Sequence, residues 1–212
     1  MGQVISLTER LARRDAQPAR SVRGAAAFFF ALNCPLSYLV AEQVERDLGE
    51  IAWVPIYAPR DARWARERLH QAAALATTKR LPLIEPENFM ADPLATTRAA
   101  LHASQHQLGR PFALACMRLA FAGGYDVGEP DLIAEAAAHA GLDVEATVSA
   151  SADAGLDGPL TSTAAALRRR GITEAPVIRI ISGWFSGFDA LTQTSAFAVA
   201  RDDFAVRAVG PA

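Results

Sequence analysis

The 212-residue sequence contains only two cysteines, Cys34 and Cys116, and they do not form a CxxC pair. A redox dithiol and a cysteine-based zinc site both need closely spaced ligands, so neither is expected. The N-terminal residues show no secretory signal, and a reducing compartment disfavours a structural disulfide. We therefore predict a cytoplasmic protein without a metal.

Long hydrophobic runs and blocks of like charge are also missing. The apolar runs are well short of the roughly 18–20 residues that a membrane-spanning helix requires. The 21 basic and 23 acidic residues are mixed along the chain and leave a net charge of −2. Nucleic-acid-binding domains usually carry a concentrated basic surface, so neither a membrane nor a nucleic acid is an expected partner.

The chain does contain a cysteine between a predicted strand and a predicted helix. Residues 25–32 form an apolar run with three consecutive aromatic residues, which predicts a short buried strand. Pro35 suits the first turn of a helix, and apolar residues then recur on one helical face as far as Leu48, where Gly49 ends the helix. Cys34 is thus predicted to lie at a helix N-terminus.

A helix N-terminus changes the chemistry of a thiol. Its free N–H groups and dipole favour negative charge, so we expect the pKa of Cys34 to fall from about 8.5 to roughly 6–7.5. Ser37, in the first turn, can donate a hydrogen bond to the thiolate or can cap the helix. The alternative is that Cys34 only fills space, as we expect of Cys116 on its apolar helix.

The rest of the chain divides into an α/β part and a helical part. A second strand is predicted at residues 51–57, where Pro55 favours the edge of a sheet. A third strand at 175–181, a turn at 182–183, a return strand and a closing helix at 189–200 follow the helical part. Predicted helices fill the intervening residues at 60–79, 94–108, 111–122, 130–140, 143–154 and 159–170.

These patterns indicate the order β-α-β, helical insertion, β-β-α. The expected segments are an N-terminal extension (1–23), an α/β domain in two parts (24–59 and 171–200), an all-helical insertion (60–170) and a C-terminal tail (201–212).

Several short motifs resemble the DsbA-type thioredoxin superfamily. NCPLSYLVAEQVE at residues 33–45 resembles its active-site junction, most closely in 2-hydroxychromene-2-carboxylate isomerases and kappa-class glutathione transferases. RDARWA at 60–65, GITEAPV at 171–177 and GFD at 187–189 follow in the same order. The resemblance implies an α/β thioredoxin-like fold, and a cis peptide bond before Pro176 that faces Cys34.

The resemblance also implies a glutathione site and, since this branch is usually dimeric, a possible homodimer. Glutathione would serve as co-substrate or cofactor. The residues implied to line its site are Pro35, Tyr38, Ala175, Pro176, Val177 and Asp189. Tyr38 could equally be a packed aromatic residue, and Asp189 could simply cap the last helix.

The motif departs from both branches that it resembles. The isomerases and transferases have a serine where this chain has Cys34, and the disulfide oxidoreductases have a second cysteine where it has Ser37. Ala31 and Leu36 also replace an acidic residue and a tyrosine of the isomerase branch.

We therefore predict a thiol-disulfide oxidoreductase or glutathione-linked thiol enzyme with Cys34 as its single nucleophile. Its substrates would be mixed disulfides or small electrophiles. The alternatives are a glutathione-dependent isomerase of an aromatic carboxylate and a non-catalytic thioredoxin-like binding module.

Overall fold

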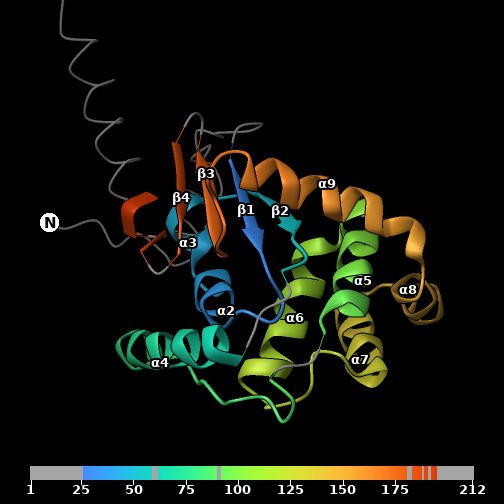
Figure 1. Cartoon of the computed structure of the whole chain (residues 1–212). Helices are drawn as coiled ribbons and strands as arrows, with labels where there is room; N and C mark the ends of the chain where they lie inside the picture. The colour runs from blue at the N-terminus through green and yellow to red at the C-terminus, as the bar shows by residue number, and fades with distance from the viewer. Residues whose placement is uncertain are drawn as a thin grey trace, which may run out of the picture.

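The centre of the fold is a four-stranded sheet with the strand order β2-β1-β3-β4 (Figure 1). The computed structural model describes residues 26–58, 62–89, 92–180, 183–187, 189, 190 and 192–194. The predicted N-terminal extension and C-terminal tail lie outside the described residues, as does most of the predicted closing helix. The strands are β1 (Ala27–Phe30), β2 (Ala52–Pro55), β3 (Val177–Ile180) and β4 (Gly183–Ser186).

Strand β1 is central, and it pairs in parallel with β2 and antiparallel with β3. Successive side chains of a strand point to opposite faces. On one face Phe28 meets Trp53 edge-to-face, with ring centroids 4.9 Å apart. On the other face Phe29 stacks on Trp184 at 5.7 Å. The predicted β-α-β unit and the edge position of β2 are confirmed.

The hairpin between β3 and β4 differs from the prediction by one residue. Ile180 pairs with Gly183, so Gly183 is the first residue of β4 and not part of the turn.

The predicted single helix after Cys34 is wrong, because it is broken into α2 (Pro35–Ala41) and α3 (Val44–Leu48). The carbonyl of Leu39 would accept the N–H of Gln43 in a continuous helix. Instead that carbonyl accepts the side-chain amide of Gln43 at 3.2 Å, while the Gln43 N–H turns back to the Val40 carbonyl. Gly49 follows α3 with φ of 76°, as its predicted stop requires.

The described residues of the insertion form helices and connecting loops but no strand, which confirms the predicted α/β fold with a helical insertion. Its helices lie mainly beside the β2 edge of the sheet, while α4 lies close to α2 (Figure 1). They are α4 (Ala62–Lys79), α5 (Leu94–Gln105), α6 (Gly109–Phe121), α7 (Pro130–Ala140), α8 (Val144–Ser151) and α9 (Asp157–Arg168), with a 3₁₀ turn at Ala154–Leu156. Among the described residues, no helix is long and apolar enough to cross a membrane.

Gly109 directly follows the predicted helix at 94–108, and a glycine there is expected to end that helix, but it is the first residue of α6. A Cβ at this position would lie 2.4 Å from Oγ of Ser104, so the glycine is required by close approach and not as a helix stop. Gly141 was expected to end the predicted helix at 130–140, and Asp143 to cap the one at 143–154; both are confirmed. Gly141 follows α7 in the left-handed conformation, and Asp143 accepts the N–H of Ala146 at 2.8 Å at the start of α8.

Two ion pairs join the broken helix to α6 of the insertion. Arg118 donates to both carboxylate oxygens of Glu42, at 2.6 and 2.7 Å. Glu45 pairs with Arg110 at 2.7 Å and also accepts the indole N–H of Trp53 at 3.0 Å. Each arginine is more than half exposed, so these pairs fix geometry more than they add stability.

Replacing Phe28 should test whether the aromatic face of β1 holds the domain together. Phe28 is fully buried, so Phe28→Ala should lower the free energy of unfolding by about 3–5 kcal/mol. Tyr125→Ala is the control, because Tyr125 is 60% exposed and its loss should change stability by less than about 0.5 kcal/mol. Urea unfolding followed by circular dichroism measures both values, and equal losses would contradict this account of the core.

Candidate functional site

Cys34 lies at the junction predicted from the sequence, immediately before α2. It is the N-cap residue, with extended backbone angles, and Pro35 opens the first turn. Its carbonyl accepts the N–H of Tyr38 at 3.2 Å, and its own N–H donates to Ala31 at 3.1 Å. No side-chain oxygen caps this helix. Pro35 has no N–H, so the first-turn N–H groups without an intrahelical acceptor are those of Leu36 and Ser37, and the N-cap position puts Cys34 at this end of the helix.

The loop before β3 meets Cys34 from the opposite side of the junction. The peptide bond between Ala175 and Pro176 is cis, as expected. Sγ of Cys34 donates to the carbonyl oxygen of Ala175 at 3.5 Å, so the predicted approach of this loop to the thiol is also confirmed. Val177 opens β3 and pairs with Phe29, which explains how residues far apart in sequence meet.

Ser37 is fully buried and accepts the backbone N–H of Ala31 at 3.3 Å. This contact ties the first turn of α2 to the end of the β1 segment. A hydroxyl that accepts one hydrogen bond can still donate its own hydrogen in another. Donation from Ser37 to the Cys34 thiolate therefore stays a prediction.

Asn33 is a site residue that sequence reasoning noted only as a strand breaker. Its side-chain N–H donates to the carbonyl of Ala58 at 3.2 Å, which fixes the Cys34 junction to the segment after β2. Its Oδ1 is buried and has no hydrogen-bond partner among the described residues. The available signal was a polar side chain between an apolar strand and the candidate cysteine.

Tyr38 packs against the insertion. It is 1% exposed and stacks on Phe121 of α6 with ring centroids 5.8 Å apart. Burial chiefly, and then the charge of Glu42, raise the pKa of Tyr38 to about 12, although Arg118 opposes the change. This geometry is that of the packed aromatic residue, and a contact with glutathione stays a prediction.

Asp189 is exposed and follows β4. Its carbonyl accepts the N–H of Gln193 at 2.9 Å, as at the start of a helix. The nearby Gly187 N–H donates to the carbonyl of Pro176, also at 2.9 Å, which links this segment to the cis-proline loop. The arrangement allows Asp189 both of its predicted roles.

A cavity of about 350 Å³ adjoins the Cys34 region. One wall is the segment after β2 that includes Ala58, the acceptor of the Asn33 amide, and another includes Glu174, which precedes Ala175. Tyr57 also lines it, and burial together with a hydrogen bond to Asp92 raises the pKa of that phenol. The cavity is thus lined by the segment that Asn33 contacts and by the loop that Cys34 contacts.

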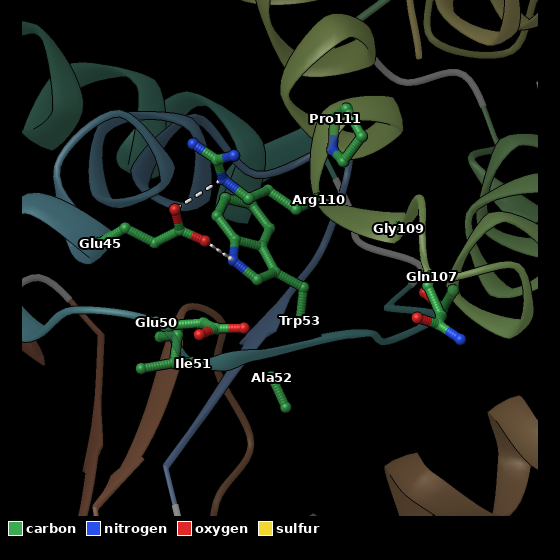
Figure 2. A pocket seen from close by; sticks show the side chains of 10 residues that line it. Glu45, Glu50, Ile51, Ala52, Trp53, Gln107, Gly109, Arg110 and Pro111 are labelled. Atoms are coloured by element: carbon green, nitrogen blue, oxygen red, sulfur yellow. Dashed lines mark hydrogen bonds and ion pairs between the residues drawn. The ribbon is translucent and has the colours of Figure 1, made fainter. Parts of the chain in front are cut away.

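A second cavity, of about 520 Å³, lies at the other end of the strands (Figure 2). Its lining includes the start of β2, whereas Cys34 follows the end of β1, which runs parallel to β2. Figure 2 shows Glu45 between the Arg110 guanidinium and the Trp53 indole, so the main charged groups there already satisfy one another. It is not part of the thiol site.

Cys116 is fully buried in α6, and burial raises the pKa of its thiol. Cys34 and Cys116 are both reduced and form no disulfide. Within the described part of the chain, no group of three or more histidine, cysteine or acidic side chains could hold a metal ion.

Neither a protein-family model nor a curated protein matches the sequence. Solved structures do match. A 2-hydroxychromene-2-carboxylate isomerase has a TM-score of 0.70 at 15% identity, over 85% of this chain and 98% of that one. A probable DsbA oxidoreductase from Streptomyces coelicolor has a TM-score of 0.63 at 18% identity, over 82% and 89%. The cytosolic disulfide reductase DsbM from Pseudomonas aeruginosa, solved with GSH, has a TM-score of 0.58 at 15% identity, over 83% and 98%.

The sheet order and the cis-proline loop facing the start of α2 define a thioredoxin-like fold with a helical insertion. The structural neighbours place this fold among those of DsbA-type oxidoreductases and 2-hydroxychromene-2-carboxylate isomerase.

Selective labelling should separate the two cysteines. In the native protein, iodoacetamide should modify Cys34 alone, because ionisation of Cys116 is suppressed by its burial in α6. Mass spectrometry of native and urea-unfolded samples measures which cysteine carries the label. In the control variant Cys116→Ser, labelling of the native protein should be unchanged. Rapid native labelling of a Cys34→Ser variant would contradict the assignment of Cys116 as inert.

Proposed function

We propose that this chain is a glutathione-linked thiol enzyme whose nucleophile is Cys34. The observation that carries the proposal is the position of the thiol, at the start of α2 and 3.5 Å from the Ala175 carbonyl of the cis-proline loop. A thiolate at this position is stabilised by nearby N–H groups. Because α2 has only seven residues, its negative end lies about 10 Å away, and local N–H groups contribute more than a long dipole.

The proposed reaction is the reduction of a mixed disulfide between a substrate thiol and glutathione. The Cys34 thiolate attacks the glutathione sulfur, the disulfide breaks, and the substrate leaves as a thiolate that takes up a proton. A second glutathione thiolate then attacks the Cys34–glutathione disulfide. Oxidised glutathione leaves and the Cys34 thiolate is restored. Overall, the sulfur of the second glutathione is oxidised from thiol to disulfide, and the substrate sulfur is reduced from disulfide to thiol.

A single-cysteine mechanism suits this site because position 37 is a serine and Cys116 is buried in another helix. The resolving thiol must therefore come from outside the protein. The structure of DsbM with GSH supports glutathione as that thiol. The cavity beside Ala58 and the unpartnered Oδ1 of Asn33 provide space and a hydrogen-bond acceptor near the loop.

The pH dependence of alkylation tests the activation of Cys34. The iodoacetamide rate, measured from about pH 5 to about pH 10, should rise with a midpoint near 6–7.5 and below the value of about 8.5 for a free thiol. Ser37→Ala should move the midpoint upward, because a hydrogen bond to the charged form favours that form. An ordinary midpoint that the substitution leaves unchanged would remove Cys34 as the nucleophile.

Glutathione binding is a separate prediction. Equilibrium dialysis at millimolar glutathione should show binding to the reduced protein, since the cis-proline loop and Asp189 together offer backbone and carboxylate partners to a γ-glutamyl peptide. Asp189→Asn should weaken binding by removing the partner of the ligand's ammonium group. Failure of the wild-type protein to bind would favour the non-catalytic binding module.

The isomerase remains a second candidate because the structural similarity to 2-hydroxychromene-2-carboxylate isomerase is high, at a TM-score of 0.70. In that reaction the sulfur of bound glutathione, and not Cys34, would act. Cys34→Ser should abolish reduction of a glutathione mixed disulfide under the thiol-enzyme proposal. Preserved isomerisation of an aromatic carboxylate by this variant would instead favour the isomerase.

Cytoplasmic location and a homodimer are further parts of the proposal.

A further inference from the structure

An ion pair holds the loop that faces Cys34 to a helix of the insertion. Nη2 of Arg68, on α4, lies 2.5 Å from Oε1 of Glu174. The Arg68 side chain is only 11% exposed, and that of Glu174 is 39% exposed. Glu174 immediately precedes Ala175, whose carbonyl accepts the Cys34 thiol. The ion pair is therefore one residue away from the atom that contacts the thiol.

The Arg68 guanidinium is fixed in one orientation. Its Nη1 donates to Oε1 of Gln71 at 2.6 Å, and its Cζ lies 5.8 Å from the centre of the Trp64 ring. Its Nε is buried and has no hydrogen-bond partner among the described residues. A charged group taken out of water needs its counterion more than an exposed one does, so Glu174 is held firmly in place.

Helix α4 is itself fixed relative to Cys34. It packs against α2, the helix that begins after Cys34, and its small residues Ala65, Ala72 and Ala76 are buried. The Glu174 carboxylate also lies beside Gly187, since its Oε2 is 3.7 Å from where a Cβ of that glycine would stand. Helix α4 therefore contacts both sides of the site: it packs on α2, which follows Cys34, and it binds the loop through Arg68 and Glu174.

We propose that Arg68 and Glu174 are positioning residues that hold the Ala175 carbonyl against the Cys34 thiol and so shape the glutathione site. This inference rests on the proposed function, in which Cys34 is the reacting thiol. Cys34 is fully buried in this conformation, so reaction requires the site to open. The ion pair restrains that opening while it keeps the loop shaped for the ligand.

Three variants test the positioning role: Arg68→Met, Glu174→Gln and the double variant. Each should raise the alkylation rate of Cys34 several-fold at high pH, where the thiol is fully ionised and the rate reports access. Each should also weaken glutathione binding by about tenfold. Because one contact is lost in all three, the double variant should match the single ones, as expected for a coupled pair.

A burial-matched control comes from the insertion. Arg98 and Asp157 join α5 to α9 through two hydrogen bonds of 2.7 and 2.8 Å, with side chains 15% and 41% exposed. Arg98→Met should lower stability comparably but leave both the high-pH alkylation rate and glutathione affinity as in the wild type. Arg68→Lys, which keeps the charge, should recover part of both properties.

Two results would overturn the inference. In one, Arg68→Met behaves like Arg98→Met, with a stability loss and unchanged thiol access. In the other, Arg68→Met and Glu174→Gln move the alkylation midpoint in opposite directions at an unchanged high-pH rate, which means that charge alone acts. Failure of the proposed function is distinguishable from both, because the wild-type thiol would then react like an ordinary cysteine.

Discussion

The site depends on the pairing of β1 with a strand on each side. Its parallel neighbour β2 leads into the insertion, and its antiparallel neighbour β3 returns from it. Because β1 and β3 are antiparallel, the C-terminal end of β1 lies beside the N-terminal end of β3. The residues that follow β1 and those that precede β3 therefore meet at the same end of the strands. The contact between Cys34 and Ala175, across 141 positions of sequence, is a consequence of this register. The insertion can vary in length without altering it, because only the ends of the insertion are constrained.

The insertion nevertheless contributes to the site through its contacts with the helix that follows Cys34. The break after α2 turns Glu42 toward α6, where Arg118 holds it by two hydrogen bonds. Tyr38 fills the space between the same two helices. On the other side, α4 packs on α2 and reaches the cis-proline loop through Arg68. The short helix that carries the thiol is therefore fixed by tertiary contacts more than by its own hydrogen bonds, as expected for two turns of helix.

The sequence predicted features whose signals are local. Pro35, the strand before Cys34 and the glycine after α7 identify element type and ends, because each acts through backbone geometry of its own neighbourhood. Features that depend on which particular side-chain atoms meet were missed or predicted wrongly. The helix breaks at Gln43 because its side-chain amide takes the Leu39 carbonyl that its own N–H would otherwise use. Gly109 is placed so close to Ser104 that a Cβ would meet the serine hydroxyl. The cis-proline contact was foreseen only because a family resemblance supplied it. Nothing local in Arg68 indicates that it would pair with Glu174.

The burial of Cys34 and its place at a helix N-terminus act on the thiolate in opposite directions. A helix terminus stabilises an anion by typically 0.3–1 kcal/mol, up to about 2 in partly buried geometry. Removal from water penalises the charged form, by more when the group is fully buried. In the closed conformation the thiol also donates to the Ala175 carbonyl, which favours the neutral form. When the loop moves away, both of these penalties decrease while the N–H groups of α2 remain in place. Opening of the loop should therefore activate the thiol as well as expose it, and a single restraint on that loop can regulate both.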